Sequence, residues 1–338
     1  MIVLTLESTC DETAAAVVTD ELQVLGQAVA TQESLHEQFN GVVPEIAARA
    51  HLERILPVMQ LALERAHVRL DQLDAVAVAN TPGLAGSLVI SLMAAKTLAL
   101  VLDIPLVGIN HVHAHIYACQ IAAQRNVYPC VGFAVSGGHT SLFDCEAPTK
   151  LTLLGGTIDD AAGEAFDKVG SMLGLAFPGG PALSKLAEQG NPAAYSFPRS
   201  FLKEDRLAFS FSGLKTAVRY AITGPGKVDL SSVTLTAQQK ADLAASFEAA
   251  VVDCLVGKAL QAIQQTGRRV LCVGGGVAAN RLFRQHLQTA AEKHSIELHF
   301  APYSMCTDNA VMGALAVERL RLAESDSLDL DVIPGLMR

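Results

Sequence analysis

The stretch MIVLTLESTCDETAAAVV, residues 1–18, reads as two apolar strands separated by a short polar turn. The runs IVLTL and AAAVV have the composition of buried strands, and ESTCDET between them supplies hydroxyls and carboxylates. The pattern returns at residues 128–145, YPCVGFAVSGGHTSLFDC, where SGGHT is the turn. Two such hairpins, one opening each half of the chain, predict an α/β protein with duplicated lobes whose turns face each other across a central cleft. Two unrelated hairpins would give the same pattern, so this alternative stays open.

The size and composition of the chain favour two well-packed domains. Single hydrophobic cores stop growing near about 250–300 residues, and this chain has 338. Half of its residues are hydrophobic and 17% are charged, which is typical of an α/β enzyme and excludes a disordered chain. We expect a first lobe at residues 1–127, completed by 302–338, and a second lobe at 128–301.

Charge and cysteine usage restrict the partners and the compartment. The net charge of −9 excludes a general nucleic-acid-binding surface, so a polyanion would need a local basic patch or a second protein. Seven cysteines without a CxxC pair indicate neither a disulfide framework nor a zinc ribbon. The N-terminus lacks the features of a signal peptide, and the apolar stretch 83–102 contains Lys96. We therefore expect a cytoplasmic protein without membrane association, with 83–102 as a buried helix.

Further elements follow from hydrophobic periodicity. The apolar spacing predicts helices at about 44–66 and 237–265 and a strand at 73–80. The run RVLCVGGG, residues 269–276, is a strand that ends in three glycines and precedes the amphipathic segment VAANRLFRQHLQTAA. A strand, a glycine turn and a helix bring backbone amides close to a phosphate or nucleoside, although tight turns without a ligand also use glycine.

The stretch INHVHAHIYA, residues 109–118, contains three alternate histidines. In a helix, His111 and His115 share one face, whereas His113 lies about 200° around the helix from His111. The pair is a half-site for zinc or iron and needs a third ligand from elsewhere. Asp308, in YSMCTDNAVMGALA, is the candidate, and its alternative role is to cap the helix that follows.

Two other acidic segments suggest binding chemistry. Asp11 and Glu12 would repel a polyphosphate unless a cation intervened, so they are interpreted as partners of a metal or its water, or as turn caps. In DDAAGEAFDKVGSMLG, residues 159–174, we expect Asp160, Gly163/Glu164 and Asp167 on one helical face. Asp167 would be placed to accept the hydroxyls of a ribose, and an exposed acidic face is the alternative. PGGP at 178–181 is predicted to be a rigid turn that admits a ligand or simply bends the chain.

Taken together, these segments resemble one family over nearly the whole chain: the tRNA N6-adenosine threonylcarbamoyltransferases (TsaD and Kae-type proteins, formerly called O-sialoglycoprotein endopeptidases). The resemblance is carried, in order, by LESTCDETAAAVV, GVVPEIAARAH, NTPGLAGSL, NHVHAH, VSGGHTSL, DDAAGEAFDKV, FPGGPALSK, FSFSGLKTA, GGGVAANRLFR and CTDNA. It implies a two-lobed actin/Hsp70/sugar-kinase (ASKHA) fold. It also implies transfer of a threonylcarbamoyl group from threonylcarbamoyl-AMP to N6 of the adenosine 3′ of the anticodon, in tRNAs that read ANN codons.

The resemblance also assigns residues. It places His111, His115 and Asp308 on the metal ligands of the family, with Fe²⁺ or Zn²⁺ as the ion and Mg²⁺ as a possible companion of bound nucleotide. Asp11 and Glu12 match the turn that we interpret as the source of a proton acceptor. The residues matching the family's substrate and adenylate contacts are Ala134, Val135, Ser136, Gly137, Gly138, Asp167, Gly180 and Asn280.

The chain departs from the family pattern at three places. HVHAH replaces HMEGH or HMEAH, ETSCDET is transposed to ESTCDET, and Ala134 stands where archaeal relatives have a metal-ligating tyrosine. We therefore expect a metal with three protein ligands and open positions.

The implied partners are tRNA, a TsaB-type paralogue and a TsaE-type ATPase, whereas some organellar members act as homodimers. An ATP-dependent small-molecule kinase of the same fold class is the main alternative function. A metalloprotease is disfavoured because HExxH is missing. A non-catalytic scaffold is disfavoured because the glycine and histidine motifs are intact.

Overall fold

The computed structural model describes residues 1–224 and 233–335. Contacts between Cα atoms divide the chain into two compact units. The first unit comprises Met1–Tyr128, Glu146–Leu151 and Ala301–Arg338, and the second comprises Pro129–Cys145 and Thr152–Phe300. Each unit is built around a five-stranded mixed sheet.

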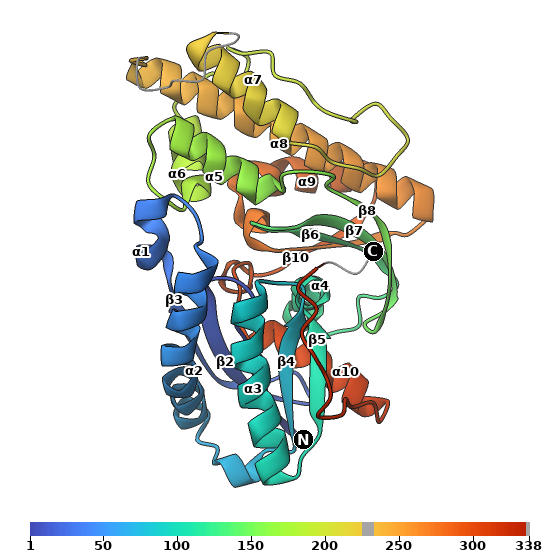
Figure 1. Ribbon diagram of the computed structural model, residues 1–338. Helices are drawn as coiled ribbons and strands as arrows, with labels where there is room; N and C mark the ends of the chain where they lie inside the picture. Colours follow the sequence, from blue (N-terminus) through green and yellow to red (C-terminus); the bar gives the residue numbers. More distant parts are fainter. Residues whose placement is uncertain (225–232, 336–338) are drawn as a thin grey trace. The chain divides into compact units, whose positions relative to one another are not determined.

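The sheet of the first unit has the strand order β3-β2-β1-β4-β5 (Figure 1). Its strands are β1 (Ile2–Glu7), β2 (Glu12–Thr19), β3 (Val24–Thr31), β4 (Ala75–Thr81) and β5 (Leu106–Asn110). β2 is antiparallel to β1 and β3, whereas β4 runs parallel to β1 and β5. The predicted hairpin of residues 1–18 is therefore confirmed.

Helices of the first unit cover this sheet. They are α1 (Glu33–His36), α2 (Pro44–Ala66), α3 (Ala85–Leu102), α4 (His111–Ala123) and α10 (Leu315–Arg321), with 3₁₀ turns η1 (Glu37–Phe39), η2 (Leu70–Gln72), η4 (Tyr303–Met305) and η5 (Val311–Ala314). Side chains alternate across β1, so that Leu4 and Leu6 join the core formed with α2 and α3. Thr5 points the other way and donates its hydroxyl to the Ala310 carbonyl at 2.6 Å, just before η5. The tail of the first unit is thereby fixed to the face of β1 opposite α2 and α3.

Helix α3 is buried along one stripe only, which corrects the expectation of a buried helix. Leu88, Leu92, Ala95 and Ala99 face the core at helical spacing, but Met93 is exposed. By length and composition α3 is the one described helix that could cross a membrane, and about a third of it (33%) is buried in the protein. The sheet covers a single face of this helix, so its other apolar side chains remain on the surface.

The sheet of the second unit has the order β10-β9-β6-β7-β8. Its strands are β6 (Cys130–Val135), β7 (Thr140–Ala147), β8 (Lys150–Gly156), β9 (Val270–Gly274) and β10 (Glu297–Phe300). Its helices are α5 (Ala162–Met172), α6 (Gly179–Ala187), α7 (Ser212–Thr223), α8 (Ala237–Thr266) and α9 (Arg281–Lys293), with η3 (Gly276–Ala279). The segment PGGP, predicted to be a rigid turn at 178–181, is instead the start of a helix, because α6 begins at Gly179.

The two sheets repeat one arrangement. In each, the first strand pairs antiparallel with the second and parallel with a later strand, which is followed outward by another parallel strand. β6 and β7 therefore correspond to β1 and β2. The two hairpins are equivalent elements of a duplicated architecture, which decides the alternative left open by the sequence.

Helix α2 packs against β3 at the closest approach permitted by glycine. A Cβ added to Gly26 would overlap the backbone of Ala62 and Ala66. We predict that Gly26→Ala lowers the free energy of unfolding by about 1–3 kcal/mol, because backbone must move to admit the methyl group. Urea unfolding measures the change, and Gly41→Ala is the control, since a Cβ there meets nothing within 4 Å. Equal unfolding midpoints for the two variants would contradict this close packing.

Candidate functional site

Helix α4 positions two imidazoles in the first unit. Its N-cap, Asn110, accepts hydrogen bonds from the amides of Val112 at 2.9 Å and His113 at 3.1 Å, which fixes the first turn of the helix. His111 and His115 follow one turn apart, with ring centroids 4.6 Å from each other. Both are buried, at 3% and 1% exposure. The predicted pairing of these two histidines on one face is present.

Asp308 meets both rings. Its Oδ1 lies 3.1 Å from Nε2 of His115 and 3.4 Å from Nε2 of His111. The alternative role as a helix cap belongs to its neighbour: Asn309 accepts a hydrogen bond from the Met312 amide at 3.2 Å. The carboxylate of Asp308 is thus directed to the histidines by the chain segment that precedes η5.

The spacing of these atoms fits a shared metal ion. One potential ligand atom each from His111, His115 and Asp308 lies within 4.8 Å of the others. Two ligands that are each about 2.1 Å from a metal are about 3.0 Å apart at a right angle and about 3.4 Å apart at the tetrahedral angle. The two distances to Asp308 match these values. Two imidazoles and a carboxylate suit Zn²⁺ or Fe²⁺.

Glu7, at the end of β1, orients one of the rings. Its carboxylate lies 3.0 Å from Nδ1 of His111, so that Nδ1–H donates to Glu7 and Nε2 is directed toward Asp308. A carboxylate in this position is a common support for a metal-binding histidine. Nδ1 of His115 is buried and has no hydrogen-bond partner within the described part of the chain. Packing, rather than a second hydrogen bond, therefore holds that ring.

Buried negative charge surrounds the histidines. Burial lowers the pKa of His111, but the carboxylates of Asp308 and Glu7 outweigh it and raise the pKa to about 9. Burial, followed by the charges of Asp308 and Asp11, raises the pKa of Glu12 to about 10. Protons therefore compensate these carboxylates in the metal-free protein, and a bound cation would replace that compensation. His113 lies outside the cluster, and burial lowers its pKa to about 4.

In the second unit, the SGG turn between β6 and β7 caps a helix. The carbonyls of Ser136 and Gly137 accept hydrogen bonds from the Gly163 and Glu164 amides at 3.2 and 3.0 Å, at the start of α5. A Cβ on Gly163 would lie 2.7 Å from the Ser136 oxygen, which explains the glycine. The amides of Gly137 and Gly138 donate to none of the described residues, so both can serve an anionic ligand. The remaining matched residues, Ala134 and Val135, are buried in β6.

Asp167 and Gly180 are neighbours, whereas Asp160 lies elsewhere. The Gly180 amide donates to Oδ1 of Asp167 at 3.1 Å, which joins α6 to α5. Asp160 was expected on the same helical face, and this is wrong because it precedes α5. Its carboxylate instead pairs with Lys168 at 2.8 Å and Lys215 at 2.7 Å.

Asn280 is an internal brace at the start of α9. Its Oδ1 accepts from the Phe283 amide at 2.8 Å. Its Nδ2 donates to Oγ of Ser184 at 3.0 Å and to Oε1 of Glu248 at 2.6 Å. Our interpretation of the sequence missed Ser184 and Glu248. The carboxylate of Glu248 inside the apolar run AASFEAAVV was the one available signal.

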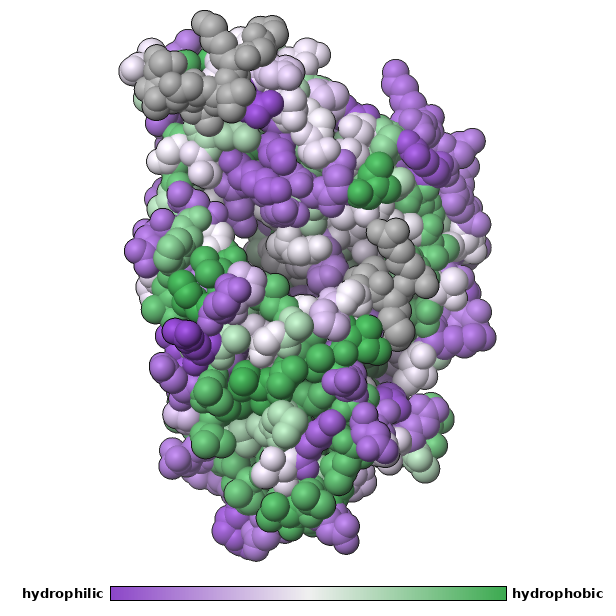
Figure 2. Space-filling view, in the orientation of Figure 1, coloured by the Kyte–Doolittle hydropathy of each residue, from purple (hydrophilic) through white to green (hydrophobic). Residues whose placement is uncertain are grey.

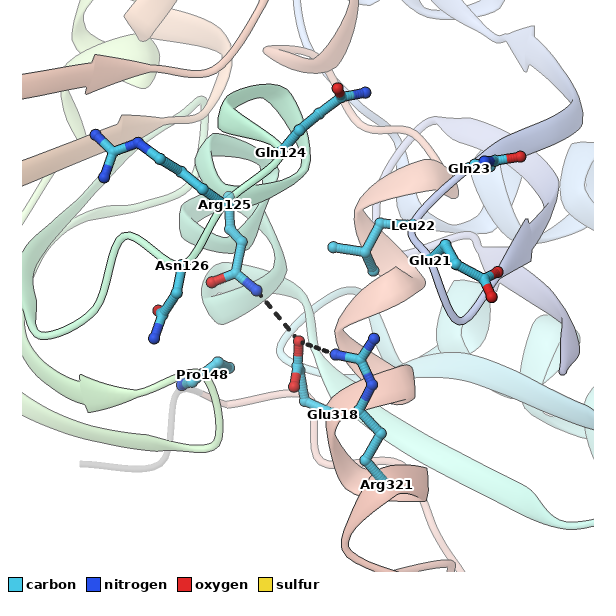
Figure 3. Close-up of a pocket in the computed structure, with 10 residues that line it drawn as sticks. Glu21, Leu22, Gln23, Gln124, Arg125, Asn126, Pro148, Glu318 and Arg321 are labelled. Atoms are coloured by element: carbon cyan, nitrogen blue, oxygen red, sulfur yellow. Dashed lines mark hydrogen bonds and ion pairs between the residues drawn. The ribbon is translucent and has the colours of Figure 1, made fainter.

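Two hollows open on the first unit. A pocket of about 320 Å³ includes Asp308 in its lining. Another, of about 570 Å³, lies between the ends of α4 and α10 and contains none of the predicted site residues (Figure 3). There Arg321 and Gln120 donate to Oε1 of Glu318 at 3.1 and 3.2 Å, and Tyr117, which is buried and not part of the lining, donates to the same oxygen at 2.6 Å. The charge of Glu318 is thus satisfied within the protein.

Comparisons with known proteins identify the family of the chain. The family model TsaD, tRNA N6-adenosine threonylcarbamoyltransferase, matches residues 23–315. A protein of that name from Rhodopirellula baltica is 59% identical, with 100% of this chain and 97% of the relative covered. Another, from Symbiobacterium thermophilum, is 48% identical, with 99% and 96% covered.

Solved structures that are less similar in sequence share the fold of this chain. Full-length HypF in its phosphate- and nucleotide-bound form matches with a TM-score of 0.61 and 16% identity, covering 96% of this chain and 56% of HypF. Component A of (R)-2-hydroxyglutaryl-CoA dehydratase from Acidaminococcus fermentans matches with a TM-score of 0.52 and 14% identity, covering 95% and 99%. These likenesses confirm the expected two-lobed ASKHA fold class. By its sequence over nearly its full length, the chain belongs to the TsaD family of tRNA N6-adenosine threonylcarbamoyltransferases.

Proposed function

We propose that this protein is a metal-assisted enzyme that transfers the threonylcarbamoyl group of threonylcarbamoyl-AMP to N6 of the adenosine 3′ of the anticodon, in tRNAs that read ANN codons. Family membership supports the reaction. The observation that carries the metal-assisted form is the cluster of the buried His111 and His115 with the partly buried Asp308, whose ligand atoms lie within 4.8 Å of one another.

The reaction requires positioning more than covalent catalysis. The amine of adenosine attacks the carbamoyl carbon, the bond from that carbon to the phosphate oxygen breaks, and AMP leaves while the amine loses a proton. The donor is an activated mixed anhydride, but the amine is a weak nucleophile, so correct orientation of the two reactants provides much of the rate gain.

Residues of the second unit would hold the adenylate. The Asp167 carboxylate would accept hydrogen bonds from ribose hydroxyls. The amides of Gly137 and Gly138 would donate to the phosphate, where negative charge grows as AMP leaves. Asn280 would shape this site through its bonds to Ser184 and Glu248.

Residues of the first unit would hold the metal and accept the proton. A divalent ion, Fe²⁺ or Zn²⁺, held by His111, His115 and Asp308 would polarise the donor and orient its threonyl carboxylate and hydroxyl. Asp11 or Glu12 would take the proton from the amine. Positive charge beside Glu12 would lower its pKa from about 10 and leave an ionised carboxylate for this role. Mg²⁺ would accompany a bound nucleotide.

An ATP-dependent small-molecule kinase is disfavoured. Phosphoryl transfer needs no buried pair of imidazoles, and the curated relatives at 59% and 48% identity carry the transferase name.

The metal centre gives the main test of this function. Purified protein with its partner proteins, the donor and unmodified tRNA should form modified adenosine. His111→Ala and Asp308→Ala should lower metal content and reduce the rate at least about 100-fold, because even groups that only support a metal ligand contribute 10–100-fold. His113→Ala is the matched control, since it removes a histidine of the same helix outside the cluster. Full rates in His111→Ala and Asp308→Ala would exclude the metal role.

Gly180 gives a test of the adenylate site. A Cβ at this position meets only the Cβ of Phe166, at 3.7 Å, so Gly180→Ala should fold normally. We predict that it raises KM for the donor about tenfold, because a methyl group crowds a closely approaching ligand. Gly213→Ala, where a Cβ meets nothing within 4 Å, is the control for steady-state kinetics. An unchanged KM would argue against adenylate contact at Gly180.

We also propose that this protein is cytoplasmic and that its partners are a TsaB-type paralogue and a TsaE-type ATPase. The first unit exposes an apolar face over α2 and α3, which is visible as the hydrophobic area in Figure 2. Its exposed side chains are Leu52, Leu56, Leu61, Val89, Met93, Leu100 and Val101. A contiguous apolar surface of this kind is typical of a protein interface. We assign this surface to binding of the paralogue. Because the chain is acidic, it would need such a partner to help bind tRNA.

The proposed interface predicts that a charge introduced within it weakens binding of the paralogue. Leu56→Glu should weaken binding of the paralogue by about 2 kcal/mol or more, because the carboxylate would lose water without gaining a partner. Isothermal titration calorimetry measures the change, with Leu322→Glu as a control of similar exposure, 60% against 68%, outside α2 and α3. Unchanged affinity would reject the assignment, and loss of self-association instead would identify a homodimer.

A further inference from the structure

A directional chain of hydrogen bonds runs through the first unit to the turn that carries Asp11 and Glu12. The Val43 amide donates to Nδ1 of His36 at 3.3 Å, and Nε2 of His36 lies 3.3 Å from Oε1 of Gln32. Nε2 of Gln32 lies 3.2 Å from Nδ1 of His51, and Nε2 of His51 lies 3.0 Å from the Cys10 carbonyl. The side chains of Gln32, His36 and His51 are completely buried.

The chemistry of the two ends fixes the tautomer of both histidines. A carbonyl only accepts, so Nε2 of His51 must carry the proton that it donates to Cys10. An amide N–H only donates, so Nδ1 of His36 must be the acceptor for Val43. The carboxamide of Gln32 then fits between them in one orientation, accepting from His36 and donating to His51.

Neighbouring groups reinforce this arrangement. Oγ1 of Thr13 lies 2.8 Å from Nδ1 of His51, so the Thr13 hydroxyl and Nε2 of Gln32 both donate to the single lone pair of that nitrogen, and Thr13 is itself fully buried. Burial also lowers the pKa of His36 and of His51, which favours the neutral rings that the chain requires. Every ring nitrogen of the two histidines therefore has a defined hydrogen-bonding role.

The chain acts on the backbone of the turn. The carbonyls of three successive residues are held by different elements: that of Thr9 by the Leu84 amide at 2.8 Å, that of Cys10 by His51 at 3.0 Å and more weakly by Oγ of Ser87 at 3.5 Å, and that of Asp11 by the Gln32 amide at 3.0 Å. In a planar trans peptide the carbonyl and the next N–H point in opposite directions. The bond from His51 therefore sets the plane of the Cys10–Asp11 peptide and directs the Asp11 N–H away from His51.

We propose that His51 is a positioning residue for the reaction: held by Gln32 and His36, it fixes the Cys10–Asp11 peptide and with it the side chains of Asp11 and Glu12. This inference rests on the proposed function, in which that turn accepts the proton of the amine. His51 itself touches no reacting atom. Its contribution is the donor that it presents to a single carbonyl.

A spectroscopic measurement tests the chain independently of activity. Two-bond ¹H–¹⁵N correlation spectra of protein labelled with [¹⁵N]histidine report the tautomer of each ring, with assignments from His51→Gln and His36→Asn. At pH 7 both rings should be neutral, protonated at Nε2 and accepting at Nδ1. Observation of either ring as the Nδ1–H tautomer or as the cation would overturn the proposal, whether or not the protein transfers threonylcarbamoyl groups.

A pair of variants tests the consequence for catalysis. His51→Leu has similar bulk but no donor, whereas His51→Gln offers an amide N–H to the Cys10 carbonyl. We expect His51→Leu to lower kcat about 10- to 100-fold with KM for tRNA and metal content unchanged, because a misplaced catalytic turn loses rate rather than binding. His51→Gln should recover most of kcat. His113→Leu, which removes an imidazole outside the chain of hydrogen bonds, should retain kcat.

The outcomes separate the two proposals. Equal losses in His51→Leu and His51→Gln, or full kcat in both, would show that the donor is not the cause and overturn the positioning role. If His51→Leu does not fold, kcat of His51→Gln and the tautomers in the unaltered protein still decide the question. Absence of transfer in the unaltered protein with its partners would refute the proposed function instead.

Discussion

The arrangement of the first unit depends on charge that is buried together. Glu7 and the two histidines of α4 are buried and Asp308 is partly buried, so an uncompensated carboxylate among them would be costly. The pKa of His111 is raised to about 9 and that of Glu12 to about 10, so that bound protons reduce the buried negative charge. The chain can satisfy the same carboxylates with a divalent ion, so the electrostatics of the metal-free protein already favour a cation.

The backbone carbonyls of the two equivalent hairpin turns are bound by different contacts in the two units. In the second unit the carbonyls of the turn cap α5, whose close approach depends on Gly163. In the first unit the carbonyls of the turn are held by Leu84, His51 and Gln32, which come from separate elements. In both turns, donors from other parts of the protein bind the backbone carbonyls. The peptide amides of one turn and the acidic side chains of the other are therefore not needed for these contacts. The same strand order thus supports a glycine turn with two amides that donate to none of the described residues in one unit, and an acidic turn in the other.

The apolar residues of α3 form two stripes with different surroundings. One stripe completes the core of the first unit, and the opposite stripe joins α2 in the exposed apolar face of Figure 2. Because both stripes of α3 are apolar, the helix has the length and composition of a membrane span, although only about a third of it (33%) is buried in the protein.

The sequence by itself determined the features encoded by short-range periodicity: both hairpins, the helix at 44–66, the long helix from residue 237 and the spacing of His111 and His115. Tertiary structure decided which distant groups meet, because such pairings depend on the path of the chain and leave no local pattern. Asp308 approaches a histidine 193 residues away, while its neighbour Asn309 takes the capping role that the sequence offered to both. Other pairings of this kind are those of Asp160 with Lys168 and Lys215, of Asn280 with Glu248, and of His51 with Gln32 and Cys10.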